Sequence, residues 1–120
     1  VFNTLNPRTV AQMRAMDTDG GGLLRRVGER FVATAPAAVD AICQAAANGD
    51  TQALGRTAHS LKSSSAGIGA DRLSALCKEI EHSVRAATVV APEVLDELRS
   101  ELRISLTAVG HELCGEAVAA

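Results

Sequence analysis

Residues 50–70 read DTQALGRTAHSLKSSSAGIGA, and this stretch decides the fold. Apolar or small side chains recur in it at spacings of four and three residues, which is the period of one face of an α-helix. Asp50 is suited to cap the first turn, and the glycines at 67 and 69 end the pattern. The stretch therefore predicts a helix over about residues 51–68, with one buried stripe: Leu54, Ala58, Leu61, Ser65 and Ile68.

Four further segments show helical periodicity. Helices are predicted over about residues 7–16, 22–47, 71–87 and 92–114, with a bend in the second near Pro36. The composition agrees, because 47% of the residues are hydrophobic but only 2% are aromatic, and Ala and Leu favour helix over strand. Short connections between long amphipathic helices indicate an all-α fold, an antiparallel up-and-down four-helix bundle. The segment 7–16 adds a short N-terminal helix, and residues 1–120 are expected to form a single domain.

Charge and composition exclude several classes of function. The net charge is -2, so no electrostatic surplus draws the chain to nucleic acid or to an anionic membrane surface. No apolar run approaches the roughly 20 residues that a transmembrane helix needs. Three widely spaced cysteines, Cys43, Cys77 and Cys114, fit a reducing compartment better than a disulfide framework. We therefore expect a cytoplasmic domain without nucleic-acid or direct membrane contact.

His59 lies on the wrong side of its helix for a core residue. At 100° per residue, its side chain is opposite the buried stripe and is predicted to face solvent. Gly55, Ser63 and Ala66 leave a clearing around it, and Lys62 places a positive charge one turn away. A neutral imidazole is a nucleophile, so this setting favours an acceptor of phosphoryl groups over an ordinary surface histidine.

The stretch 54–70, followed by Leu73, Leu76, Cys77 and the run Glu79–Glu81, resembles the histidine-containing phosphotransfer (HPt) domains of multistep phosphorelays. Weaker similarity extends over almost the whole chain. The resemblance implies that His59 is phosphorylated, on its distal ring nitrogen, and that Lys62 is the charge partner of the phosphoimidazole. The family commonly has glycine where Ser63 stands, which leaves transfer rate and partner choice open. We assign the docking surface to six residues: Gln52, Gly55, Arg56, Ser63, Ala66 and Gly67.

The resemblance also implies a mechanism. The partners would be response-regulator receiver domains, and His59 would accept a phosphoryl group from one aspartyl phosphate and pass it to another receiver. The domain would be a phosphocarrier without its own ATP site, and no enzyme. Magnesium would belong to the receiver, because no carboxylate flanks His59 on its own helix face. We expect no cofactor and no metal in the domain itself, since His111 and Cys114 lack two further zinc ligands.

The start of the sequence suggests a larger parent protein. The chain begins at Val1 without methionine, and residues 3–8 resemble the lead-in to the C-terminal HPt module of a bacterial hybrid sensor histidine kinase. Such a parent would be anchored in the inner membrane while this module is cytoplasmic. A freestanding carrier is the alternative. As an isolated domain, the chain is expected to be a monomer.

Two other functions compete with this interpretation. The first is the dimerisation and phosphoacceptor domain of a histidine kinase, where an acid and then a proline typically follow the histidine; Ser60 and the lack of a nearby proline count against it. The second is a helical bundle that docks a receiver or an enzyme through its small-residue face without phosphotransfer. The variant His59→Gln separates phosphotransfer from docking alone.

Overall fold

The computed structural model describes residues 5–18, 20 and 22–115, and within these ranges every regular element is an α-helix. The helices are α1 (Pro7–Met16), α2 (Gly22–Asn48), α3 (Thr51–Gly67), α4 (Asp71–Arg85) and α5 (Pro92–Glu112). The all-α prediction is confirmed. The largest errors in the predicted bounds are at two C-terminal ends. α4 ends at Arg85 where residue 87 was predicted, and α5 ends at Glu112 where residue 114 was predicted. Residues 3 and 4 of the lead-in lie outside the described residues.

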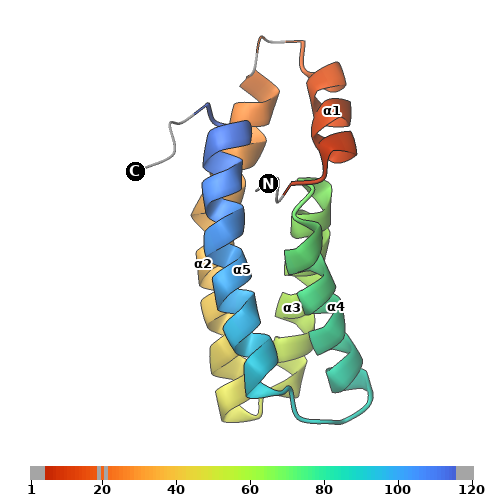
Figure 1. Cartoon of the computed structure of the whole chain (residues 1–120). Coiled ribbons are helices and arrows are strands. Elements are labelled where there is room, and N and C mark those ends of the chain that lie inside the picture. Colours follow the sequence, from red (N-terminus) through yellow and green to blue (C-terminus); the bar gives the residue numbers. More distant parts are fainter. Residues whose placement is uncertain (1–4, 19, 21, 116–120) are drawn as a thin grey trace.

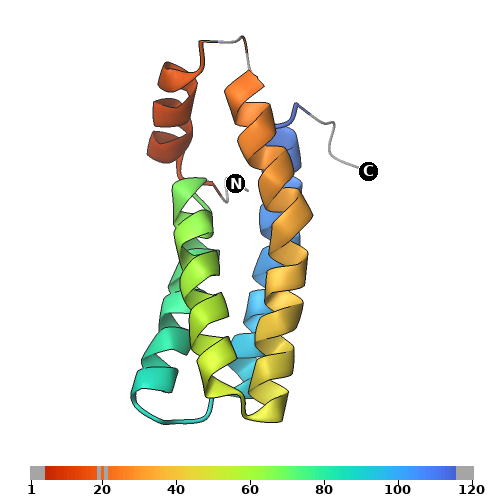
Figure 2. The same ribbon diagram turned by 180° about the vertical axis from the view of Figure 1, so that it is seen from behind.

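The four long helices run alternately down and up along one axis, as an antiparallel bundle (Figure 1). α3 packs between α2 and α4, and α5 packs against α2 and α4 on the other side. The short helix α1 stands beyond the end of α3 and α4, as both views show (Figure 2). This is the predicted architecture, a four-helix bundle with an additional N-terminal helix.

Side-chain caps satisfy the N-terminal ends of α1 and α3, whereas α4 and α5 have no such cap. The Asn6 side chain accepts a hydrogen bond from the Arg8 amide, and the Asp50 side chain accepts one from the Ala53 amide. Asp71 is the first residue of α4, behind Ala70, so its side chain does not cap that helix. Its carboxylate instead accepts a hydrogen bond from the Asn6 amide group, at 2.8 Å. Asp71 therefore ties the entry of α1 to the start of α4.

The interior is aliphatic, as the composition requires. All five residues of the stripe predicted for residues 51–68 are buried, and Ser65 among them is fully inaccessible to solvent. α2 runs unbroken through Pro36 and buries Phe31, Ala35 and Ile42. The register of α3 is thus fixed by its buried stripe, and the opposite face of the helix is left for solvent.

Candidate functional site around His59

His59 lies in the middle of α3, on the face turned away from the bundle interior. Its side chain is 66% exposed, while the neighbouring Ala58 is completely buried. The prediction that the imidazole faces solvent is confirmed. Gly55 stands one turn before His59, and a Cβ atom there would meet only Val84 Cγ1 of α4 within 4 Å.

A carboxylate from the next helix orients the imidazole. His59 Nδ1 lies 2.9 Å from Glu81 Oε2 of α4. An ionised carboxylate can only accept a hydrogen bond, so Nδ1 carries the proton and donates it. In the neutral ring, Nε2 then holds the free lone pair. The contact therefore fixes both the tautomer and the direction of the ring, and it leaves Nε2 as the ring nitrogen with an available lone pair.

Lys62 contacts the same carboxylate from the other side. Its ammonium lies 2.6 Å from Glu81 Oε1, and the Glu81 side chain is only 10% exposed. The Lys62 ammonium holds the pKa of Glu81 below its ordinary value, against the effect of burial, and His59 adds to the lowering. Glu81 is therefore ionised at neutral pH and links the two residues that the sequence singled out.

This arrangement corrects the expectation that no carboxylate flanks His59. That expectation considered only the face of its own helix, and α3 indeed contains no Asp or Glu. Glu81 comes from α4, and a single-helix projection cannot show a contact between helices. One signal was present in the sequence: Glu81 is four residues after the apolar Cys77 and adjoins Ile80, at the edge of the stripe of α4. A carboxylate at such an edge faces a neighbouring helix.

Further contacts fix α3 against α4 at the same level. The Ser74 hydroxyl donates a hydrogen bond to the backbone carbonyl of Lys62, at 3.0 Å. At Gly55, a Cβ atom would lie 3.4 Å from Val84 Cγ1, an ordinary contact distance. Gly55 is half-buried toward α4, so it serves the helix contact as well as the clearing. The other five predicted docking residues are all exposed: Gln52, Arg56, Ser63, Ala66 and Gly67.

Cys77 does not compete with His59 as a nucleophile. Its side chain is completely buried one turn before Glu81. Burial, and secondarily the charge of Glu81, raises the pKa of the Cys77 thiol to about 12. The thiol is therefore protonated and inert at neutral pH.

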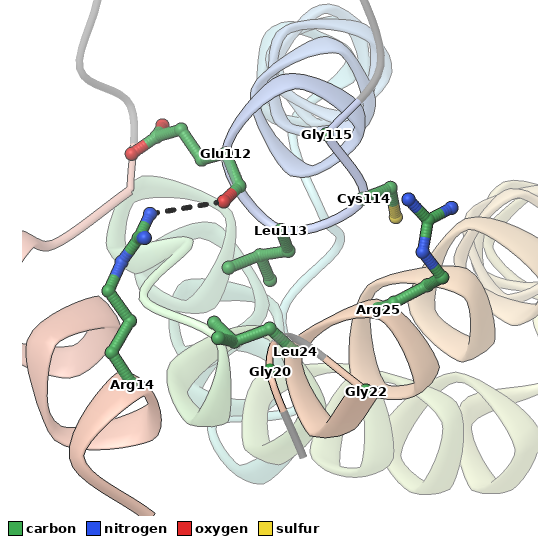
Figure 3. A pocket seen from close by; sticks show the side chains of 9 residues that line it. All are labelled: Arg14, Gly20, Gly22, Leu24, Arg25, Glu112, Leu113, Cys114 and Gly115. Carbon is green, nitrogen blue, oxygen red and sulfur yellow. Dashed lines mark hydrogen bonds between the residues drawn. The ribbon is translucent and has the colours of Figure 1, made fainter. Parts of the chain in front are cut away.

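Other candidate sites lie elsewhere or lack ligands. Cys114 is buried, and the described residues contain no cluster of three His, Cys, Asp or Glu side chains that could hold a metal ion. A cavity of about 480 Å³ lies at the N-terminal end of α2, between the side chains of Arg14 and Arg25 (Figure 3). The Arg14 guanidinium there donates to the backbone carbonyl of Glu112. None of the residues lining this cavity belongs to α3 or α4.

None of the described helices combines the length and the apolar composition that a membrane span requires.

In this helical bundle, an exposed histidine is held in one orientation beside a lysine. This arrangement is typical of a histidine phosphocarrier. The sequence model of the Hpt domain matches residues 27–111, and the chain belongs to the Hpt domain family. Its role is histidine phosphotransfer in the phosphorelays of two-component signalling, and HPt domains interact with receiver domains. This membership favours the HPt interpretation over a kinase dimerisation domain. That the domain extends over all of residues 1–120 stays a prediction.

A solved structure agrees in fold and in family. The chain is similar to the crystal structure of histidine-containing phosphotransfer protein B (HptB) from Pseudomonas aeruginosa PAO1, with a TM-score of 0.83 and 28% sequence identity. The similarity covers 95% of this chain and 97% of that one. None of the curated proteins compared with the chain matches it.

Proposed function

We propose that Nε2 of His59 accepts a phosphoryl group from the aspartyl phosphate of one receiver domain and passes it to the aspartate of another. The observation that carries this proposal is an exposed imidazole whose Nδ1 is bound to the ionised Glu81. Glu81 is a positioning residue, because it holds the ring and does not itself meet the phosphoryl group.

The transfer step balances without a further reactant. The lone pair of Nε2 forms the N–P bond while the P–O bond to the receiver aspartate breaks, and the electron pair stays on the leaving carboxylate. The ring gains a positive charge, which the Nδ1–H···Glu81 hydrogen bond stabilises. The reverse step returns the phosphoryl group to an aspartate, so the direction of flux depends on the partners.

Magnesium in this proposal comes with the receiver domain. The one carboxylate at His59 already accepts from His59 and pairs with Lys62. Its oxygens are therefore engaged, and nothing in this donor set fits a resident cation. The metal would neutralise charge on the phosphoryl group from the receiver side.

The cellular setting follows from the same proposal. We infer a module that acts in the cytoplasm, where receiver domains are found, as a monomer in isolation and as part of a hybrid sensor histidine kinase. A freestanding carrier would use the same site.

The test uses the full chain and a panel of receiver domains phosphorylated with acetyl phosphate and Mg²⁺. We expect acid-labile phosphate on His59, located by mass spectrometry, and complete loss in His59→Gln. His82→Gln is the matched control, because His82 is also exposed and its signal should be unchanged. Label that persists in His59→Gln, or wild-type protein that takes no label from any receiver, would overturn the proposal. Docking of a receiver without any label would instead support a binding bundle.

A further inference from the structure

The protein face around His59 carries positive charges in addition to that of Lys62, which is already paired with Glu81. By helical register, Arg56 lies one turn before His59 on the same face of α3. On α4, Lys78 and Arg85 lie one turn before and one turn after Glu81, whose contacts show that this side of α4 faces α3. The basic cluster is defined as these three residues: Arg56, Lys78 and Arg85.

The basic cluster has no counter-charge in the part of the chain that the structure describes. All three side chains are exposed, and none forms an ion pair or hydrogen bond with another described residue. α3 contains no acidic residue, and Glu79 points away because it is two positions from Glu81. Glu81 itself is occupied by Lys62 and His59. This local excess of positive charge occurs in a chain whose net charge is -2.

Lys62 is a poorer candidate for binding new negative charge. Its ammonium is 2.6 Å from a carboxylate, and its side chain is only 29% exposed. Moving it to a phosphoryl group would leave Glu81 ionised at a nearly buried position, which is costly. The exposed guanidinium of Arg56 is free of that cost, and its planar donors suit phosphoryl oxygens.

We propose that the basic cluster binds the negative charge of the incoming phosphoryl group and of the carboxylates beside it on the receiver, with Arg56 as the residue that contacts the phosphoryl oxygens. The inference rests on the proposed function and adds the positively charged side chain that binds the phosphoryl group. Charge complementarity is the argument for the occupant, since an aspartyl phosphate and its neighbouring carboxylates form an acidic surface. Glu81 positions the nucleophile, Lys62 keeps Glu81 ionised, and Arg56 meets the phosphoryl group.

The experiment uses phosphoramidate, a small anionic donor that needs no receiver. Nε2 attacks its phosphorus, and the P–N bond breaks with ammonia as the leaving group. The rate of phosphohistidine formation is measured by ³¹P NMR for the wild-type chain, Arg56→Gln and the triple variant Arg56→Gln, Lys78→Gln and Arg85→Gln. We expect Arg56→Gln to slow the reaction by about fivefold at low salt, and the triple variant by more.

Arg103→Gln is the matched control, because Arg103 is an exposed arginine of α5, which packs on the other side of the bundle. It should react within about twofold of the wild type. The effect of Arg56→Gln should shrink in 0.5 M salt, and Arg56→Lys should recover part of the rate, whereas a structural defect would respond to neither.

The two proposals fail in different ways. If Arg56→Gln and the triple variant react as fast as Arg103→Gln while His59 is still labelled, the basic cluster is wrong and the phosphoacceptor stands. If the wild-type chain gains no label on His59 from phosphoramidate or from any receiver, both proposals are wrong.

Discussion

At Gly28, α2 packs against the C-terminal end of α5 and the turn after it with no space for a further carbon, whereas α3 and α4 meet at their outer edge through polar side chains. At Gly28 of α2, a Cβ atom would lie 2.8 Å from Cys114 Sγ and 3.0 Å from Leu113 Cβ. At Gly55 of α3, the nearest atom would be Val84 Cγ1 at 3.4 Å. The two glycines therefore have different roles: Gly28 is required for close packing, whereas Gly55 is not.

The difference separates stability from chemistry. The α2–α5 contact cannot change without moving the C-terminal turn around Leu113 and Cys114, both buried. The α3–α4 contact includes a partly exposed lysine and an exposed histidine, both held by one carboxylate. Tight apolar packing fixes the scaffold, and the polar contact beside solvent leaves the imidazole accessible to a partner.

Breaking the α2–α5 contact should have the largest effect. Gly28→Val would place two methyl groups where even a Cβ atom collides with Cys114 and Leu113. We expect the free energy of unfolding to fall by about 3 kcal/mol, as in overpacked cores. Chemical denaturation measures it. Gly67→Val is the control, because a Cβ atom at Gly67 meets nothing within 4 Å, and it should change stability far less. Equal losses in both variants would contradict the role of Gly28 in close packing.

The comparison also shows which parts of the molecule the sequence could predict. The exposure of His59 was predictable, because the register of one helix follows from its own apolar period. The role of Gly28 was not singled out, although the residue stands between Leu24 and Phe31 on the buried side of α2. Its meaning depends on Cys114, far away in the sequence. Glu81 was missed for the same reason, since its partners are on another helix.

Removing Glu81 should weaken the α3–α4 contact and slow the chemistry. In Glu81→Gln, the amide can offer its NH₂ group to His59, so Nδ1–H is no longer specified and Lys62 loses its ion pair. We expect phosphohistidine formation from phosphoramidate to fall about tenfold and stability at pH 7 to fall by about 1–2 kcal/mol. Glu79→Gln is the control, since it removes the same charge from an exposed site on the same helix.

The pH dependence of that stability loss has a definite sign. The folded-state pKa of Glu81 is below its ordinary value of 4.5, so the ionised side chain stabilises the fold fully above pH 4.5. This contribution is lost as the pH falls through the lower folded-state pKa. The difference in unfolding free energy between wild type and Glu81→Gln should therefore shrink on acidification. A difference that stays constant from pH 7 to well below 4.5 would show that ionisation of Glu81 is not what stabilises the contact.

The smallest effect is expected at the connection between α4 and α5, where the two helix pairs join. Ala87 follows the cap of α4 with φ 55°, a left-handed conformation that a Cβ atom disfavours and glycine adopts readily. Ala87→Gly should therefore raise the free energy of unfolding by about 0.5–1 kcal/mol and leave phosphorylation of His59 unchanged. Ala86→Gly is the matched control, because Ala86 has right-handed helical angles and loses stability when its side chain is removed. If thermal denaturation finds both variants destabilised equally, the left-handed residue carries no strain, and the connection contributes nothing that distinguishes it from the helices on either side.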